Sequence, residues 1–128
     1  MSKQIIKTNN APAPIGPYNQ AVSAAGLLFV SGQVAINPHT SELVVSSVKD
    51  ETIQVMENLK AVLTEAGVGF ENIVKTTIFL SDMVFFAEVN EIYGSYFTGD
   101  YPARETVAVK TLPKNVNVEI SAIATLSL

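Results

Sequence analysis

Residues 47–67 carry the strongest local signal in this chain, that of an amphipathic helix. Ser47 can cap the first turn, Asp50 follows three residues later, and Gly67 can adopt the left-handed conformation that ends many helices. Between these signals, residues recur mostly at spacings of three and four and so share one largely apolar face: Val48, Thr52, Val55, Met56, Leu59, Leu63 and Ala66. A helix with one apolar face must bury it against another element, so the fold needs a partner layer.

The other apolar segments predict that this partner layer is a β-sheet. Residues 73–80 are β-branched and aromatic, which is typical of a central strand. Residues 21–23 and 27–31 predict two strands joined by a turn at Ala25-Gly26, after a first strand at 4–7. The proline-rich stretch 11–17 cannot continue a sheet and is expected to form an ordered loop. Residues 106–109 and 116–126 are expected to form a closing hairpin.

A second helix is expected to begin at Ser81 and Asp82 and to end before Gly99, with a broad apolar face that includes Tyr96 and Phe97. The whole chain, residues 1–128, therefore predicts one α+β domain in which two helices cover one face of a mixed sheet. The opposite face is left open. Only 16% of the residues are charged, so we expect part of the apolar surface to be covered by other subunits.

Composition excludes several functional classes. The net charge is −4 and no basic run occurs, so nucleic-acid or anionic-membrane binding is not expected. The chain has no cysteine, hence no thiol nucleophile and no disulfide. His39, the only histidine, is expected to be a solvated loop residue, so neither a histidine metal site nor a serine–histidine nucleophile is expected. No secretory or membrane-spanning segment is recognisable, which favours a cytoplasmic location.

Two residues are candidates for chemistry. Arg104 is the only arginine and follows a rigid proline at the start of a strand. Its planar fork can hold a carboxylate through two parallel hydrogen bonds, although a surface ion pair would also explain it. Glu119 alternates with apolar residues on a strand, where it is either part of a solvated face or a general base. Gly32 could allow close approach of a ligand, or mark a bulge.

Several short motifs, none specific alone, resemble the RidA (YjgF) family of reactive-intermediate deaminases when taken together. In family order they are Ile15-Gly16-Pro17-Tyr18, Ser31-Gly32-Gln33, Asn58-Leu59, Val74-Lys75-Thr76-Thr77, Val89-Asn90-Glu91 with Tyr93, Tyr101-Pro102-Ala103-Arg104, and Leu112-Pro113-Lys114 through Val118-Glu119-Ile120. They extend over almost the whole length of the chain.

The resemblance implies a chorismate-mutase-like fold, a homotrimer with sites between subunits, and hydrolysis of 2-imino acids (2-iminobutanoate, 2-iminopropanoate) to 2-keto acids and ammonia without metal or organic cofactor. It implies that Arg104 binds the substrate carboxylate and that Glu119 activates water. Further expected contacts are Tyr18, Ser31, Gly32, Asn90 and the main chain of Thr106. The alternative is a trimer that binds keto acids and regulates amino-acid metabolism without turnover.

The chain departs from the family pattern beside the arginine. Many members have serine where this chain has Glu105, and many have cysteine where it has Thr106. Strand alternation should direct Glu105 to the face opposite Arg104, so we expect the substitution to be tolerated. Ser121 replaces a frequent glutamate, with no consequence that the sequence predicts.

Overall fold

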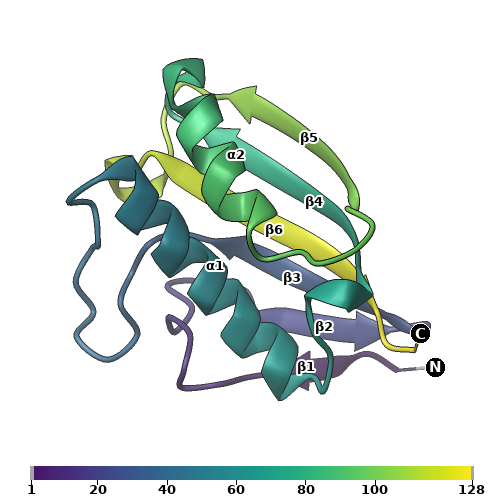
Figure 1. Cartoon of the computed structure of the whole chain (residues 1–128). Helices are drawn as coiled ribbons and strands as arrows, with labels where there is room; N and C mark the ends of the chain where they lie inside the picture. The colour runs from purple at the N-terminus through teal and green to yellow at the C-terminus, as the bar shows by residue number, and fades with distance from the viewer. Residues whose placement is uncertain (1, 128) are drawn as a thin grey trace.

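The C-terminal strand lies in the interior of a six-stranded sheet, and the rest of the fold is arranged around it (Figure 1). This computed structural model describes residues 2–127. In chain order the elements are β1 (Gln4–Ile6), β2 (Ala21–Ala24), β3 (Leu27–Gln33), α1 (Val48–Glu65), β4 (Ile73–Leu80), α2 (Phe86–Gly94), β5 (Ala103–Ala108) and β6 (Val118–Thr125), with short 3-10 helices at Phe70–Asn72, Met83–Phe85 and Pro113–Asn115.

The strand order is β1-β2-β3-β6-β4-β5, and every pairing is antiparallel except that of β4 with β5. The expected closing hairpin is therefore wrong: β4 lies between β5 and β6. The burial patterns give the reason. Alternate residues of β6 are buried along its whole length, which suits a strand with neighbours on both sides, whereas β5 is mostly exposed and forms an edge.

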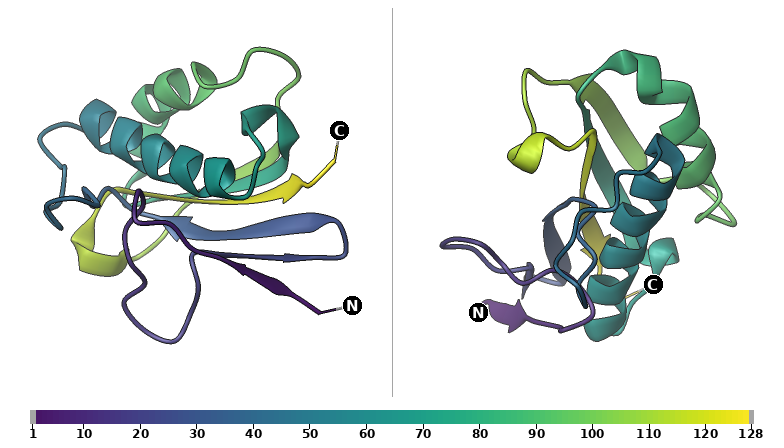
Figure 2. Two further views of the ribbon diagram at one scale, coloured as in Figure 1. Left: turned by 90° about the horizontal axis from the view of Figure 1, so that it is seen from below. Right: turned by 90° about the vertical axis from the view of Figure 1, so that its left-hand side faces the viewer.

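Both helices cover the same face of the sheet, as the edge-on view shows (Figure 2). Helix α1 begins as expected, with Ser47 Oγ accepting from the main-chain N–H of Asp50 at 3.0 Å. Its apolar stripe meets the inward-facing residues of β6, and Leu28, Met56, Leu59, Ile78 and Ile120 are fully buried there. The predicted two-layer α+β arrangement is confirmed.

The second helix is shorter than expected. Asp82 caps a 3-10 turn rather than the helix itself, and α2 ends at Gly94. Tyr96 and Phe97 lie beyond its end and pack with Phe70, whose ring centroid is 5.3 Å from that of Tyr96 and 5.6 Å from that of Phe97. The apolar pattern continued past the helix because these rings close an aromatic cluster under the following loop.

The face opposite the helices carries an apolar row that crosses four strands in register: Ile5, Val22, Phe29 and Ile123. Ile5 and Phe29 are 48% and 40% exposed, which is high for such residues on a paired sheet. At one end of this face lie the proline-rich loop and the Pro113–Asn115 turn (Figure 2). None of the helices described in residues 2–127 has the length and apolar character that crossing a membrane requires.

Candidate functional site

The Arg104 side chain lies on the helix side of β5, where α2 holds it. Its Nη1 donates a hydrogen bond to Asn90 Oδ1 at 2.7 Å. The guanidinium carbon lies 5.1 Å from the ring centroid of Tyr93 and 5.7 Å from that of Phe86, within the range of cation–π attraction. One amide and two rings therefore orient the guanidinium, while its remaining N–H groups stay available.

The Arg104 pocket has a volume of about 460 Å³. It is lined by Asn90, Tyr93, Gly94, Tyr101, Pro102 and Arg104. No carboxylate within residues 2–127 forms a salt bridge with Arg104, so the surface ion pair considered from the sequence is not formed here. Burial raises the pKa of the Tyr93 phenol, partly offset by its 2.7 Å hydrogen bond with Thr76 and by the charge of Arg104. The pocket thus offers a cation and neutral walls, which suits a ligand carboxylate.

Glu119 lies on the opposite face of the sheet. It occurs at the start of β6 between the buried residues Val118 and Ile120, so its side chain points away from the helices. The side chain opens into a pocket of about 530 Å³. The lining combines apolar and polar residues: Ile15, Tyr18, Ser31, Gly32, Val34, Ile36, Pro113, Lys114 and Glu119. Burial raises the pKa of the Glu119 carboxyl, which brings it closer to that of an effective general base.

Gly32 makes the position of Glu119 possible. The pairing of β3 with β6 shifts register between Val30 and Gln33, so the bulge, one of the two alternatives left open for Gly32, is present. A Cβ atom on residue 32 would lie 2.5 Å from Glu119 Oε2 and 2.8 Å from its carboxyl carbon. The close approach that glycine allows is therefore that of the Glu119 side chain.

Tyr18 and Ser31 carry the other polar groups of the Glu119 pocket. Ser31 Oγ donates to the main-chain oxygen of Asn19 at 2.6 Å, which fixes its hydroxyl proton and leaves the oxygen able to accept a hydrogen bond. Tyr18 is half exposed, and its hydroxyl oxygen accepts a long hydrogen bond of 3.3 Å from the main-chain N–H of Ile15. Its own proton remains free to donate to a ligand.

The expected site residues thus fall into two groups. Arg104 and Asn90 share one pocket, and Tyr18, Ser31, Gly32 and Glu119 share the other. Thr106 lines neither; its hydroxyl is buried and has no hydrogen-bond partner within residues 2–127. Within one chain the two pockets open on opposite faces of the sheet, and β4 separates the strands that carry Arg104 and Glu119. Arg104 and Glu119 of one chain therefore line separate pockets.

Glu105 points away from Arg104, as strand alternation predicted. Its Oε2 pairs with Lys75 Nζ at 3.1 Å and accepts from Thr77 Oγ1 at 2.9 Å, both on β4. These contacts, with the hydrogen bond from Lys75 as the larger cause, lower the pKa of the Glu105 carboxyl. Its negative charge is therefore engaged on the open face and does not compete for the guanidinium.

Sequence reasoning missed several residues around the two pockets. Val34, Ile36 and Lys114 line the Glu119 pocket but were not singled out as site residues, and Phe86, whose ring lies beside the Arg104 guanidinium, was taken only as part of a helix face. The available signal for Lys114 was its place in a proline-containing turn. In the structure it adopts a left-handed conformation with φ of 58°, which non-glycine residues seldom take.

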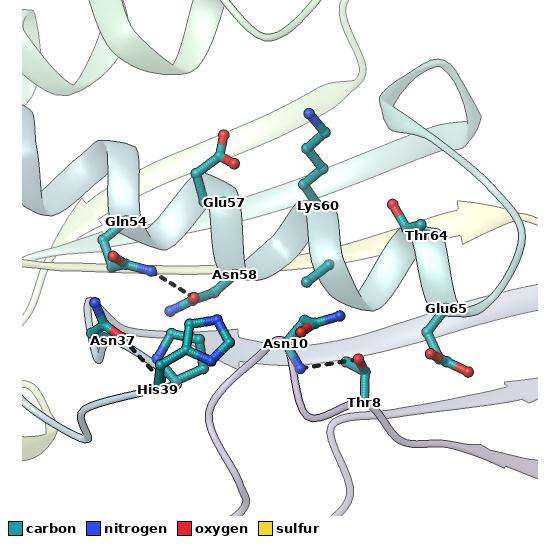
Figure 3. A pocket seen from close by; sticks show the side chains of 12 residues that line it. Thr8, Asn10, Asn37, His39, Gln54, Glu57, Asn58, Lys60, Thr64 and Glu65 are labelled. Carbon is teal, nitrogen blue, oxygen red and sulfur yellow. Dashed lines mark hydrogen bonds between the residues drawn. The ribbon is translucent and has the colours of Figure 1, made fainter.

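A third pocket lies between α1, the 37–40 turn and the first residues after β1 (Figure 3). Its volume is about 510 Å³, and His39 lies at its rim as the exposed turn residue that was expected. The side chain of Asn58, which lines this pocket, is engaged in hydrogen bonds within the protein. It donates to the main-chain oxygens of Val34 and Ile36 and accepts from Gln54 Nε2. Within residues 2–127 no three histidine, cysteine, aspartate or glutamate side chains gather as a metal site.

Comparison with known proteins places this geometry in a family. The family described as Endoribonuclease L-PSP matches residues 8–126. The chain belongs to this family, which is the RidA (YjgF) family. A RutC family protein of Pyrococcus horikoshii is 50% identical over 95% of this chain and 97% of its own length. The mouse protein named 2-iminobutanoate/2-iminopropanoate deaminase is 47% identical over 95% of this chain and 90% of its own length.

Solved structures of the family share the fold. The Rid family protein YyfA of Yersinia pestis has a TM-score of 0.95 and 48% identity, covering 97% of this chain and 99% of its own. Escherichia coli TdcF, solved with bound serine, has a TM-score of 0.92 and 41% identity over 95% of this chain and 98% of its own. The names given to the family and its members state different activities, from endoribonuclease to deaminase, so family membership by itself leaves the reaction open.

Proposed function

We propose that this RidA-family protein hydrolyses 2-imino acids to 2-keto acids and ammonia, with 2-iminobutanoate and 2-iminopropanoate as substrates. One observation carries the proposal most directly: the protein presents an oriented guanidinium that pairs with no carboxylate of residues 2–127, and a partly buried carboxyl with a raised pKa. These are the two groups that this reaction needs. The relation to the mouse protein of that name supports it.

We propose further that each active site forms between two subunits of a homotrimer. Arg104 and Glu119 of one chain occupy pockets on opposite faces, so a complete site requires Arg104 from one subunit and Glu119 from a neighbour. The exposed apolar row on the open face supplies a surface for association. The number three follows from the family resemblance.

In the proposed reaction, the guanidinium of Arg104 binds the substrate carboxylate, oriented by Asn90 and by the two rings beside it. Glu119 takes a proton from a water molecule as the water oxygen attacks the imine carbon. The resulting carbinolamine receives that proton on nitrogen, the C–N bond breaks, and the hydroxyl proton passes to the departing nitrogen, so that one imine and one water give one 2-keto acid and one ammonia. Such acid–base assistance contributes ~10²- to 10⁴-fold.

Subunit mixing tests the shared site. Arg104→Lys and Glu119→Gln are each expected to have little activity alone in an assay that generates 2-iminobutanoate at a concentration well below the wild-type KM and follows its loss. Co-refolding equal amounts of the two should restore activity, because roughly a quarter of the randomly formed interfaces would pair an intact Arg104 with an intact Glu119. The control is the double variant, with both substitutions in one chain, refolded with an equal amount of wild type in the same way. It measures the effects of dilution and of refolding yield.

The outcomes separate the alternatives. No recovery on mixing would mean that the two groups do not act in one shared site. Wild-type protein that binds keto acids but gives no rate above the uncatalysed background would favour the regulatory, non-catalytic trimer. The cytoplasmic location expected from the sequence stays a prediction, as does the absence of nucleic-acid partners.

A further inference from the structure

Glu51 is a buried carboxylate that the proposed reaction does not use. It lies in the first turn of α1 and is fully inaccessible to solvent. No lysine, arginine or histidine within residues 2–127 forms a salt bridge with it. Burying a carboxylate is costly unless hydrogen bonds satisfy it, so its contacts indicate what the residue holds in place.

Within residues 2–127 the Glu51 carboxylate accepts three hydrogen bonds, and all three come from the two residues that precede Glu119. Oε2 accepts from the main-chain N–H groups of Asn117 at 2.7 Å and Val118 at 3.0 Å. Oε1 accepts from Asn117 Nδ2 at 3.0 Å. The carboxylate therefore binds the start of β6 directly to helix α1.

The same asparagine is tied to the end of β4. Ser81 Oγ donates to Asn117 Oδ1 at 2.8 Å, and the main-chain N–H of Ser81 donates to the main-chain oxygen of Asn117 at 3.0 Å. Glu51, Asn117 and Ser81 thus join α1, β6 and β4 at one point. The Pro113–Asn115 turn, which precedes Asn117, does not by itself fix the position of β6. It is irregular, and Lys114 and Asn115 both adopt left-handed conformations in it.

A small displacement of the chain at the start of β6 would also move Glu119, the second residue of this strand. Its carboxylate fits against Gly32 so closely that one added carbon at residue 32 would collide with it. A β6 strand that shifted or rotated at its first residue would move the carboxylate within this narrow space. We propose that Glu51 is a positioning residue, which fixes the start of β6 so that Glu119 points into its pocket beside Gly32. The catalytic part of this inference rests on the proposed function.

The hydrogen bonds predict which substitution of Glu51 should keep the start of β6 in place. In Glu51→Gln, one amide oxygen can still accept from both main-chain N–H groups. The new NH₂ group would face Asn117, whose side-chain amide can turn over to present its oxygen, and the Ser81 hydroxyl can then accept instead of donate. Glu51→Ala keeps none of these bonds and leaves the two buried N–H groups unpaired.

The experiment compares Glu51→Gln, Glu51→Ala and a control, Thr52→Ala, in the full-length protein. Thr52 is fully buried in the same turn, but within residues 2–127 its hydroxyl donates only to the main-chain oxygen of Val48, so Thr52→Ala removes a buried hydrogen bond that does not involve β6. We expect Glu51→Ala to lower kcat by up to ~100-fold through misplacement of Glu119. Keto-acid affinity should fall much less than kcat, because the ligand carboxylate is bound by Arg104, which is oriented by α2 and not by Glu51 or β6. Glu51→Gln and Thr52→Ala should retain most of the wild-type kcat.

A second readout does not depend on catalysis. Carbon-detected NMR titration follows the pKa of Glu119, which burial raises in the wild type. Glu51→Ala should shift that pKa toward the ordinary glutamic acid value, whereas Glu51→Gln should leave it raised. If wild type proved inactive, the proposed function would fall while this titration still tested the positioning role.

An unchanged Glu119 pKa in folded Glu51→Ala would overturn the inference, as would a loss of kcat in Thr52→Ala equal to that in Glu51→Ala. Should Glu51→Ala not fold, Asn117→Ala takes its place, because it removes the side-chain link and keeps the main-chain bonds. It should move the pKa and kcat in the same direction by a smaller amount. No change in either quantity would refute the role.

Discussion

A side chain on Gly32 could not coexist with Glu119 in its present position, since even a Cβ atom would lie 2.5 Å from Glu119 Oε2. The Glu119 carboxylate on β6 therefore fills the space that a side chain at the β3 bulge would take. This relationship couples a backbone feature to the proposed general base and leads to the first prediction.

Gly32→Ala should displace the Glu119 carboxylate and lower imine hydrolysis by ~10- to 100-fold, the scale of a misplaced catalytic group. Keto-acid binding through Arg104 should change little. Gly99→Ala is the matched control, because an added Cβ there meets no atom within 4 Å. Measuring kcat and ligand affinity for both variants checks the prediction, and equal kcat in Gly32→Ala and wild type would contradict it.

Arg104→Lys keeps the charge but removes the fork, and it also loses the bond to Asn90 Oδ1. Loss of a charge-assisted contact should weaken keto-acid binding by about 2 kcal/mol, with a matching rise in KM. Asn90→Ala should give a smaller loss because the guanidinium is kept but less well oriented. Calorimetric titration of 2-ketobutyrate measures both. Wild-type affinity in the lysine variant would rule out the carboxylate clamp.

Glu119→Gln keeps the size of the side chain and removes its ability to take a proton. Imine hydrolysis should fall by ~100-fold or more, while ligand binding persists. In wild type the rate should rise with pH as Glu119 loses its proton, with a midpoint above the ordinary glutamic acid value of about 4.3 because burial raises its pKa. A rate that is flat through this region, or equal in the two proteins, would exclude Glu119 as the base.

The same raised pKa predicts a change in stability. The folded state binds the Glu119 proton more tightly than the unfolded state, so the free energy of unfolding falls as pH rises through the interval between the two pKa values. At neutral pH the ionised Glu119 is therefore destabilising, and Glu119→Gln should unfold at a higher temperature than wild type. The advantage should vanish below about pH 4, where both side chains are neutral. Thermal unfolding at several pH values provides the test.

The open face predicts association. Phe29, in the middle of the apolar row, is 40% exposed on one chain. Phe29→Lys should place a charge in the proposed interface and shift the protein toward smaller species with loss of activity. Light scattering at micromolar concentration measures the mass of both proteins. A wild type that is monomeric under these conditions would remove the basis for the trimer.

Local patterns were enough to predict most elements. The cap at Ser47, the stripe along α1 and the turn at Ala25-Gly26 each depend on residues close in sequence, and all three are found, with positive φ at both turn residues. The place of β6 was missed because its pairing with β3 joins residues such as Leu28 and Ala124, which are far apart in the chain. Alternation shows that a strand is buried but does not name its neighbours.

The site was predictable in part for similar reasons. Arg104 stood out as the single arginine and Glu119 by its alternation on a strand, but no pattern showed that they lie on opposite faces. Glu51 was overlooked because acidic residues are common in the first turn of a helix. Its position four residues before Val55, on the buried side of α1, was the available signal that this carboxylate is not solvated.

The interior position of β6 has a consequence for how the domain folds. Strands β1–β3 and the pair β4–β5 are connected within the sheet only through β6, so neither half completes its hydrogen bonding until that strand is in place. Because β6 follows every other element, pairing must bring together segments separated by most of the chain, which slows folding. We therefore expect that no stable subdomain forms during synthesis before β6 is available. The whole sheet should then form in one cooperative step.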